Sequence, residues 1–153
     1  MSAIERTLVI IKPDAVQRRL AGEILRRFEQ KGFKLAGLKL ARLPRKDLEV
    51  HYLAHREKPF YPTLLDFMTR GPVILAVLEG LRAITVVRKM MGKTFSYDAE
   101  PGTIRGDLGL SGQFNLIHGS DSPEAAQREI GIFFRPEELV DHRMPDDAWL
   151  AGE

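Results

Sequence analysis

The sequence predicts an α/β sandwich with a ferredoxin-like βαββαβ core, in which helices cover a small four-stranded antiparallel sheet and a helical hairpin is inserted. Two observations favour this class. Short β-branched or apolar runs alternate with segments whose apolar residues recur at helical spacing, and most connections between them are short. No repeat, linker or low-complexity segment divides the 153 residues. We therefore expect one domain with its own core.

The first elements follow from local patterns. Thr7–Ile11 predicts a buried strand, because it is a short β-branched run that ends before Lys-Pro-Asp. Helical spacing predicts a helix over residues 21–31 that ends at Gly32. Imperfect alternation over residues 33–43 predicts a strand with one exposed face, in which Gly37 is a candidate β-bulge.

The middle of the chain contains the inserted hairpin. Residues 45–70 have a helical pattern that is broken at Pro59 and Pro62, which predicts two helices. Residues 73–79 are the most apolar strand candidate, and residues 83–91 predict a helix closed by glycine. These elements supply the third strand and its following helix.

A long loop precedes the last strand and helix. Residues 93–113 are rich in glycine and show little periodicity, so we expect a loop, and loops of this length are usually functional. Residues 115–118 predict a short strand. The last helix begins at Ser122-Pro123, since serine is a favoured N-cap and proline a favoured first-turn residue.

Composition excludes several classes of protein. The net charge is +2, so bulk charge indicates no nucleic-acid partner, although the pI is about 9.0. The absence of cysteine excludes disulfides, thiolate nucleophiles and cysteine-ligated metals. No apolar run approaches the roughly 18 residues of a membrane span, and no basic leader precedes the first strand. We expect a soluble cytoplasmic protein.

Familiar catalytic motifs are absent from the sequence. Gly92-Lys93-Thr94 resembles the end of a Walker A loop, but Val87 stands where that motif needs glycine. The chain also lacks HExxH, an EF-hand loop and the glycines of a nucleophile elbow. The corresponding enzyme classes are therefore excluded.

The strongest nucleophile candidate is His118. It lies at the end of a predicted strand that faces a helix N-terminus, where backbone N–H groups and the helix dipole stabilise anions. Neutral imidazole is abundant at pH 7 and can be phosphorylated. Glu129, in the following helix, could orient the ring. Taken alone, a single histidine is more often a solvated or hydrogen-bonded loop residue.

Two further groups could bind a phosphorylated ligand. The first group supplies cations and a hydroxyl for phosphate oxygens, and the second supplies a hydroxyl, an imidazole and a stacking ring. The first comprises Lys12, Arg88, Thr94 and Arg105, and the second comprises Tyr52, His55 and Phe60. Taken singly, the charged residues are more often surface charges, and the aromatic ones are more often packed within the hairpin.

Several blocks of sequence along the chain form a distinctive series. In order, they are Glu5–Asp14, Arg26–Phe33, Lys58–Phe60, Gly71–Val73, Pro101–Asp107, Asn115–Asp121 and Arg135–Val140. The most specific block is Asn-Leu-Ile-His-Gly-Ser-Asp at residues 115–121. Together the blocks resemble the nucleoside diphosphate kinase family, whose active-site signature this block matches. The resemblance identifies residues 1–153 as a single nucleoside diphosphate kinase-like domain.

The resemblance implies a role for each candidate residue. His118 would carry the phosphate between a nucleoside triphosphate and a diphosphate, with Glu129 and Ser120 holding its ring. Phe60 and Leu64 would contact the base, with broad base and sugar specificity. Mg²⁺ would be held mainly by the phosphates, with Asp121 reaching it through water. The phosphates and sugar would be bound by Lys12, which also assists catalysis, and by Tyr52, His55, Arg88, Thr94, Arg105 and Asn115.

The chain departs from the family pattern in two places. Residues 111–114, Ser-Gly-Gln-Phe, replace the usual Val-Gly-Arg, and Ser96 replaces a proline in the loop that builds trimer contacts. The C-terminal segment that contains Trp149 resembles the long form of the family. That form implies a homohexamer, with a homotetramer as the alternative.

Two rival functions can be weighed on the sequence. Ferredoxin-like sheets also bind single-stranded RNA, but the aromatic strand pattern of that class is missing. A member of the same family without catalysis would lack His118, Lys12 or Arg105, and all are present. We therefore expect an enzyme with no need for a nucleic-acid or membrane partner.

Overall fold

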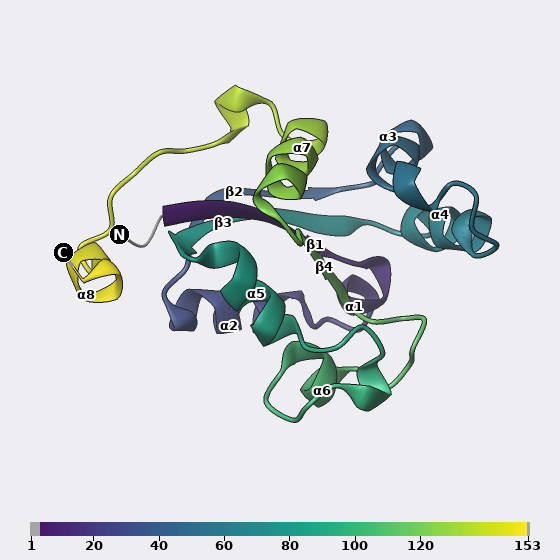
Figure 1. Cartoon of the computed structure of the whole chain (residues 1–153), viewed down its shortest axis with the longest axis horizontal. Coiled ribbons are helices and arrows are strands. Elements are labelled where there is room, and N and C mark those ends of the chain that lie inside the picture. Colours follow the sequence, from purple (N-terminus) through teal and green to yellow (C-terminus); the bar gives the residue numbers. More distant parts are fainter. Residues whose placement is uncertain (1–3, 153) are drawn as a thin grey trace.

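The computed structural model describes residues 4–152, and its centre is one four-stranded sheet (Figure 1). The strand order is β2-β3-β1-β4, and every neighbouring pair is antiparallel. The strands are β1 (Ile4–Ile11), β2 (Lys34–Ala41), β3 (Val73–Leu81) and β4 (Ile117–Gly119). The predicted ferredoxin-like sheet is therefore confirmed.

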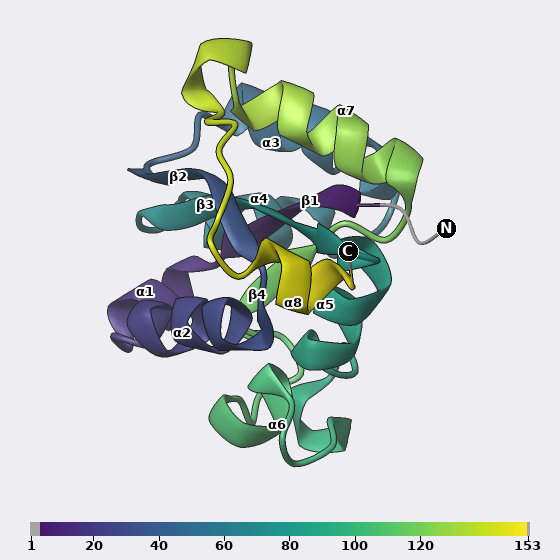
Figure 2. The same cartoon turned by 90° about the vertical axis from the view of Figure 1, so that its left-hand side faces the viewer.

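Helices pack on both faces of the sheet, which lies between them in both views (Figures 1 and 2). The first face is covered by α3 (Arg45–His51), α4 (Tyr61–Thr69) and α7 (Pro123–Phe133). The second is covered by α1 (Pro13–Gln17), α2 (Ala21–Lys31), α5 (Ala83–Met91) and α6 (Ile104–Leu108). The remaining elements are α8 (Asp147–Ala151) and the 3₁₀ turns η1 (Leu53–His55), η2 (Ser96–Asp98) and η3 (Pro136–Glu138). Within residues 4–152 no helix has the length and apolar character that crossing a membrane requires.

Each face of the sheet has its own hydrophobic core, and strand β1 contributes apolar side chains to both. Successive side chains of a strand point to opposite faces, so Leu8 and Ile10 pack against the α3, α4 and α7 layer, whereas Val9 and Ile11 pack against the other layer. All four are fully buried. Such a strand reads as a continuous apolar run, which is why no alternation is visible in its sequence.

The predicted elements differ from the observed ones mainly at their ends. The helices over residues 21–31 and 83–91 have the predicted bounds. The register of β2 shifts between Leu35 and Gly37, as expected for a bulge at this glycine. The predicted loop over residues 93–113 contains η2 and α6, which are too short to produce a periodic signal. The short helix α1 was likewise not predicted.

Candidate active site

The end of β4 places His118 against the buried carboxylate of Glu129. β4 is an edge strand on which His118 pairs with Ile10, and α7 begins just beyond it, where Ser122 accepts a hydrogen bond from the Ala125 amide. His118 Nε2 lies 2.8 Å from Glu129 Oε1. Ser120 Oγ donates to the same Oε1 over 2.8 Å. Glu129, in the middle of α7, thus fixes the orientation of the imidazole.

These contacts determine which ring nitrogen of His118 carries the proton. Burial raises the pKa of Glu129, but the hydrogen bonds from His118 and Ser120 outweigh it and hold the pKa below its usual value. An ionised carboxylate only accepts hydrogen bonds, so Nε2 is the donor of the neutral ring. The lone pair of His118 is therefore on Nδ1. The His118 side chain is 21% exposed, so a ligand can reach it.

His51, the last residue of α3, is a neighbour of His118 that the sequence analysis missed. The two rings lie edge to face, with centroids 4.7 Å apart. Burial, followed by repulsion from His118 when that ring is protonated, lowers the pKa of His51 to about 3, so the His51 ring is neutral at pH 7. Both its nitrogens are buried, and neither forms a hydrogen bond with any residue between 4 and 152. Its only sequence signal is a polar residue on the buried face of a helix.

Lys12 links the end of β1 to the segment before β4. Its ammonium donates to Asn115 Oδ1 over 2.8 Å, and Asn115 Nδ2 donates to the Thr94 carbonyl over 2.9 Å. Burial, with a smaller contribution from the charge of Arg105, lowers the pKa of Lys12 to about 8. The contacts therefore bring together three residues that are far apart in the sequence.

Arg105 is a buried cation that braces the same segment. Its guanidinium donates to the carbonyls of Asn115, Gly92 and Ile117 over 3.0, 3.0 and 2.6 Å. Burial, followed by the charge of Arg88, lowers the pKa of Arg105 to about 10, so it stays charged at neutral pH. Arg88 itself donates to the Gly119 carbonyl over 3.0 Å, next to His118. Both cations therefore lie beside β4.

A strained turn separates Asn115 from β4, and it explains why the strand is shorter than predicted. Leu116 has φ = 74°, and the Ile117 amide donates to the Asn115 carbonyl over 2.8 Å, which makes a γ-turn of the rare kind. The Leu116 amide donates to Asp14 Oδ2 over 3.1 Å, and its carbonyl accepts from the Lys12 amide over 2.8 Å. Asp14 is thus a second residue that the sequence analysis did not single out. Such strain persists only where the surroundings enforce it, as at functional sites.

The helical hairpin contributes an aromatic wall. Tyr52 packs against His51 with ring centroids 4.4 Å apart, and His55 stacks on Tyr52 at 6.1 Å. His55 also contacts Phe60 at 5.4 Å, and Phe60 is 49% exposed. Leu64 packs partly buried against the same core as Tyr52. A series of ring contacts therefore runs from His118 to an exposed ring at the surface.

The two departures from the family pattern have local structural roles. Phe114 packs against Phe67 with centroids 5.0 Å apart, and the Arg70 guanidinium lies 5.9 Å from the Phe114 ring. Ser111 Oγ accepts from the amides of residues 113 and 114, which holds the turn before Phe114. Ser96 is buried against Gly109, where any side chain would collide with it. The residues that replace the family pattern thus stabilise the loop and pack it against α4.

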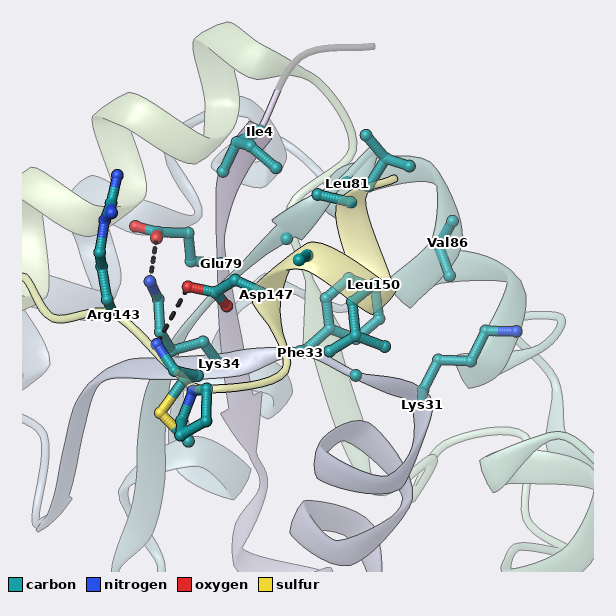
Figure 3. Close-up of a pocket in the computed structure, with 16 residues that line it drawn as sticks. Ile4, Lys31, Phe33, Lys34, Glu79, Leu81, Val86, Arg143, Asp147 and Leu150 are labelled. Carbon is teal, nitrogen blue, oxygen red and sulfur yellow. Dashed lines mark hydrogen bonds and ion pairs between the residues drawn. The ribbon is translucent and has the colours of Figure 1, made fainter. Parts of the chain in front are cut away.

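A cavity of about 590 Å³ lies away from these residues (Figure 3). It is lined by Ile4 and Glu79 of the sheet and by Leu150 of α8. Ile4 begins β1, whereas Lys12 follows its last residue, so the cavity is at the opposite end of the strand from the site. Glu79 is paired with Lys34 at 2.9 Å there. None of the predicted site residues lines this cavity.

Comparison with known proteins identifies the family. The family model for nucleoside diphosphate kinase matches residues 5–139. A nucleoside diphosphate kinase of Thermomicrobium roseum is 58% identical over 149 residues, covering 97% of this chain and 100% of the relative. One of Pyrococcus horikoshii is 57% identical over 145 residues, covering 93% and 92%. The solved structure of a Halobacterium salinarum nucleoside diphosphate kinase in complex with CDP aligns with a TM-score of 0.94 at 47% identity, covering 97% of this chain and 99% of that one. The chain belongs to the nucleoside diphosphate kinase family.

Proposed function

We propose that the protein transfers the terminal phosphate of a nucleoside triphosphate to a nucleoside diphosphate through a phosphohistidine on His118. The observation that carries this proposal is the 2.8 Å hydrogen bond to Glu129, because it leaves the lone pair of His118 on Nδ1. Nδ1 attacks the terminal phosphorus, and the bond from that phosphorus to the bridging oxygen breaks with its electrons on the departing diphosphate. Glu129 stabilises the positive ring that results. An oxygen of a second diphosphate then reverses the step.

The remaining residues are proposed to bind the nucleotide. Lys12, Arg88 and Arg105 supply three cations beside His118, and the guanidinium of Arg105 keeps two N–H groups that its three carbonyls do not use. Phe60 offers an exposed ring on which a base can stack, next to Leu64. Tyr52, His55, Thr94 and Asn115 are proposed to contact the phosphates and the sugar. The Halobacterium salinarum relative has been solved in complex with CDP, which supports a nucleotide as the ligand.

Mg²⁺ fits this site as an ion carried by the phosphates. The chain's own contribution is Asp121, an exposed carboxylate between β4 and α7 that can reach the ion through water. The buried cluster of His51, His118 and Glu129 does not fit Mg²⁺, because this hard cation prefers oxygen ligands. When bound, the ion neutralises negative charge on the phosphates.

A labelling experiment tests the phosphohistidine. The protein should acquire label when it is incubated with Mg²⁺ and a nucleoside triphosphate labelled in its terminal phosphate, without any acceptor. The label should be acid-labile and alkali-stable, as expected for a phosphorus–nitrogen bond, and a nucleoside diphosphate should remove it. Exchange activity without any labelled protein would show that transfer is direct.

The charge state of Lys12 predicts a loss of nucleotide affinity at high pH. The pKa of Lys12 is about 8, below the 10.5 expected in the unfolded chain, so folding favours the neutral amine. The contribution of Lys12 to the free energy of unfolding therefore rises as the pH rises from 8 to 10.5. Phosphate binding needs the charged form. We therefore expect kcat/KM to fall about tenfold per pH unit above pH about 8. Lys12→Arg keeps its charge and should show no such fall, and a flat wild-type profile to pH about 9.5 would contradict the assignment.

The contacts available to the base predict broad specificity. Stacking on Phe60 is worth about 1–3 kcal/mol and tolerates any base, whereas discrimination needs buried polar groups matched to one base. The pair of Lys12 and Asn115 near the sugar favours recognition of the 3′-hydroxyl over the 2′-hydroxyl. With one donor and a panel of diphosphate acceptors, kcat/KM should vary less than about a hundredfold, or 2.7 kcal/mol, between bases. A larger preference would refute this assignment.

We propose that the protein is a homo-oligomer, most simply a homohexamer, with a homotetramer as the alternative. Two separate apolar surfaces could each contact another subunit. The edge strand β2 exposes Leu38 and Leu40. The loop between α5 and β4 exposes Phe95, Tyr97 and Leu110. Trp149 is 90% exposed on α8. Light scattering at micromolar concentration should give six times the chain mass of 17.3 kDa. A monomeric mass would contradict the proposal.

A further inference from the structure

Three potential metal ligands meet beside the His118 ring, which contacts Glu129 through Nε2 and not through the proposed nucleophile Nδ1. A ring nitrogen of His51, a ring nitrogen of His118 and a carboxylate oxygen of Glu129 all lie within 4.8 Å of one another. They come from α3, β4 and α7, so three different elements supply one ligand each. His51 packs against Tyr52 and Phe133 of the core between the sheet and α3, α4 and α7, and the partly exposed His118 connects the cluster to solvent.

The second observation is that His51 has no hydrogen-bond partner for either of its nitrogens among residues 4–152. The residue is 7% exposed, and both nitrogens are buried. Its ring packs between Tyr52, Phe133 and His118. Buried polar atoms in proteins are normally paired, and an exception calls for an explanation. A neutral imidazole nitrogen that faces another imidazole and a carboxylate has the chemistry to bind a metal ion.

We propose that His51, His118 and Glu129 bind Zn²⁺ in the unphosphorylated protein and that the ion holds His118 in an unreactive form. Two imidazoles and one carboxylate, with a fourth position left for water, are a donor set that zinc takes in proteins. Tetrahedral zinc needs ligand atoms about 3.4 Å apart. The 2.8 Å contact between His118 and Glu129 must therefore open by about 0.6 Å. The His51 nitrogen, which lies within 4.8 Å of the other two ligand atoms, must approach them by at most about 1.4 Å.

The expected effect on His118 follows from its tautomer and rests on the phosphohistidine function proposed above. Zinc forms a bond to Nε2 and displaces its proton, which moves to Nδ1, so the ring stays neutral and no net proton is released. The lone pair that would attack phosphorus is then no longer available on Nδ1. Conversely, a phosphate on Nδ1 leaves the proton on Nε2 and its hydrogen bond to Glu129 intact. Zinc and phosphate should therefore exclude each other.

Metal binding is tested without nucleotide and independently of activity. Protein stripped with a chelator is titrated with Zn²⁺, and with Co²⁺ as a coloured probe of tetrahedral geometry. The wild type should bind one Zn²⁺ per chain, and His51→Phe, which keeps the ring packing but removes both nitrogens, should bind at least about tenfold more weakly. His142→Gln, on a half-buried histidine outside the cluster, should bind like the wild type. Equal binding by the wild type and His51→Phe would overturn the proposal.

Two further measurements separate this proposal from the proposed function and from a folding defect. Wild-type protein that has first been phosphorylated should lose the Co²⁺ absorption, a comparison that needs no variant. In the exchange assay, half-inhibition of His51→Phe should need at least about tenfold more Zn²⁺ than half-inhibition of the wild type, each measured against its own zinc-free rate. Absence of zinc-free exchange in the wild type would refute the proposed function. Normal exchange by a wild type that binds no zinc would refute only the zinc site.

Discussion

His118→Ala is expected to acquire no label from a nucleoside triphosphate and to lose phosphate exchange by about 10⁴-fold or more. The reason is that the variant lacks the nitrogen on which the intermediate forms, and removal of a nucleophile costs an enzyme most of its rate. The substitution should leave the fold intact, since His118 is partly exposed and lies on an edge strand. Labelling and coupled exchange assays measure the two losses.

His142→Gln provides a matched control for this experiment. His142 is half-buried and lies in the segment between η3 and α8, outside the candidate site. This variant should keep wild-type label and wild-type exchange. If His118→Ala exchanged phosphate at the wild-type rate, or took up label at another residue, the phosphohistidine assignment would be wrong.

Arg105→Met is expected to lower the free energy of unfolding by about 3–5 kcal/mol. The substitution leaves the carbonyls of Asn115, Gly92 and Ile117 without their shared donor, and each lost hydrogen bond to a charged group is worth about 1.5–3 kcal/mol before relaxation. It also removes a charge that helps to lower the pKa of Lys12. The fall in kcat/KM at high pH should therefore move to higher pH.

Denaturant unfolding at one fixed protein concentration measures the stability change, because the stability of an oligomer depends on concentration. Arg26→Met is the control, since Arg26 is an exposed surface arginine paired with Glu23 and should change stability little. An Arg105→Met protein as stable as the control would show that the buried guanidinium does not brace the loop.

The strands and helices of this protein could be predicted because their signals are local. The β-branched run of β1, the helical spacing of α2 and the Ser-Pro start of α7 each act within a few residues. The same is true of the glycine at the bulge in β2, where the backbone register shifts. Short elements such as α1 and α6 were missed, because five residues span too little of the helical period to be recognised.

The sequence by itself predicted the chemistry of the candidate site, since the resemblance to the family implies His118 as the nucleophile and the cations that accompany it. Only the tertiary structure decided which atoms meet. His51 reaches His118 because α3 packs on α7, and Asp14 holds the turn at Leu116 because β1 and β4 are neighbours in the sheet. Neither contact has a local pattern, because the partners are separated by 67 and 102 residues and are joined only when the apolar faces of the sheet are buried.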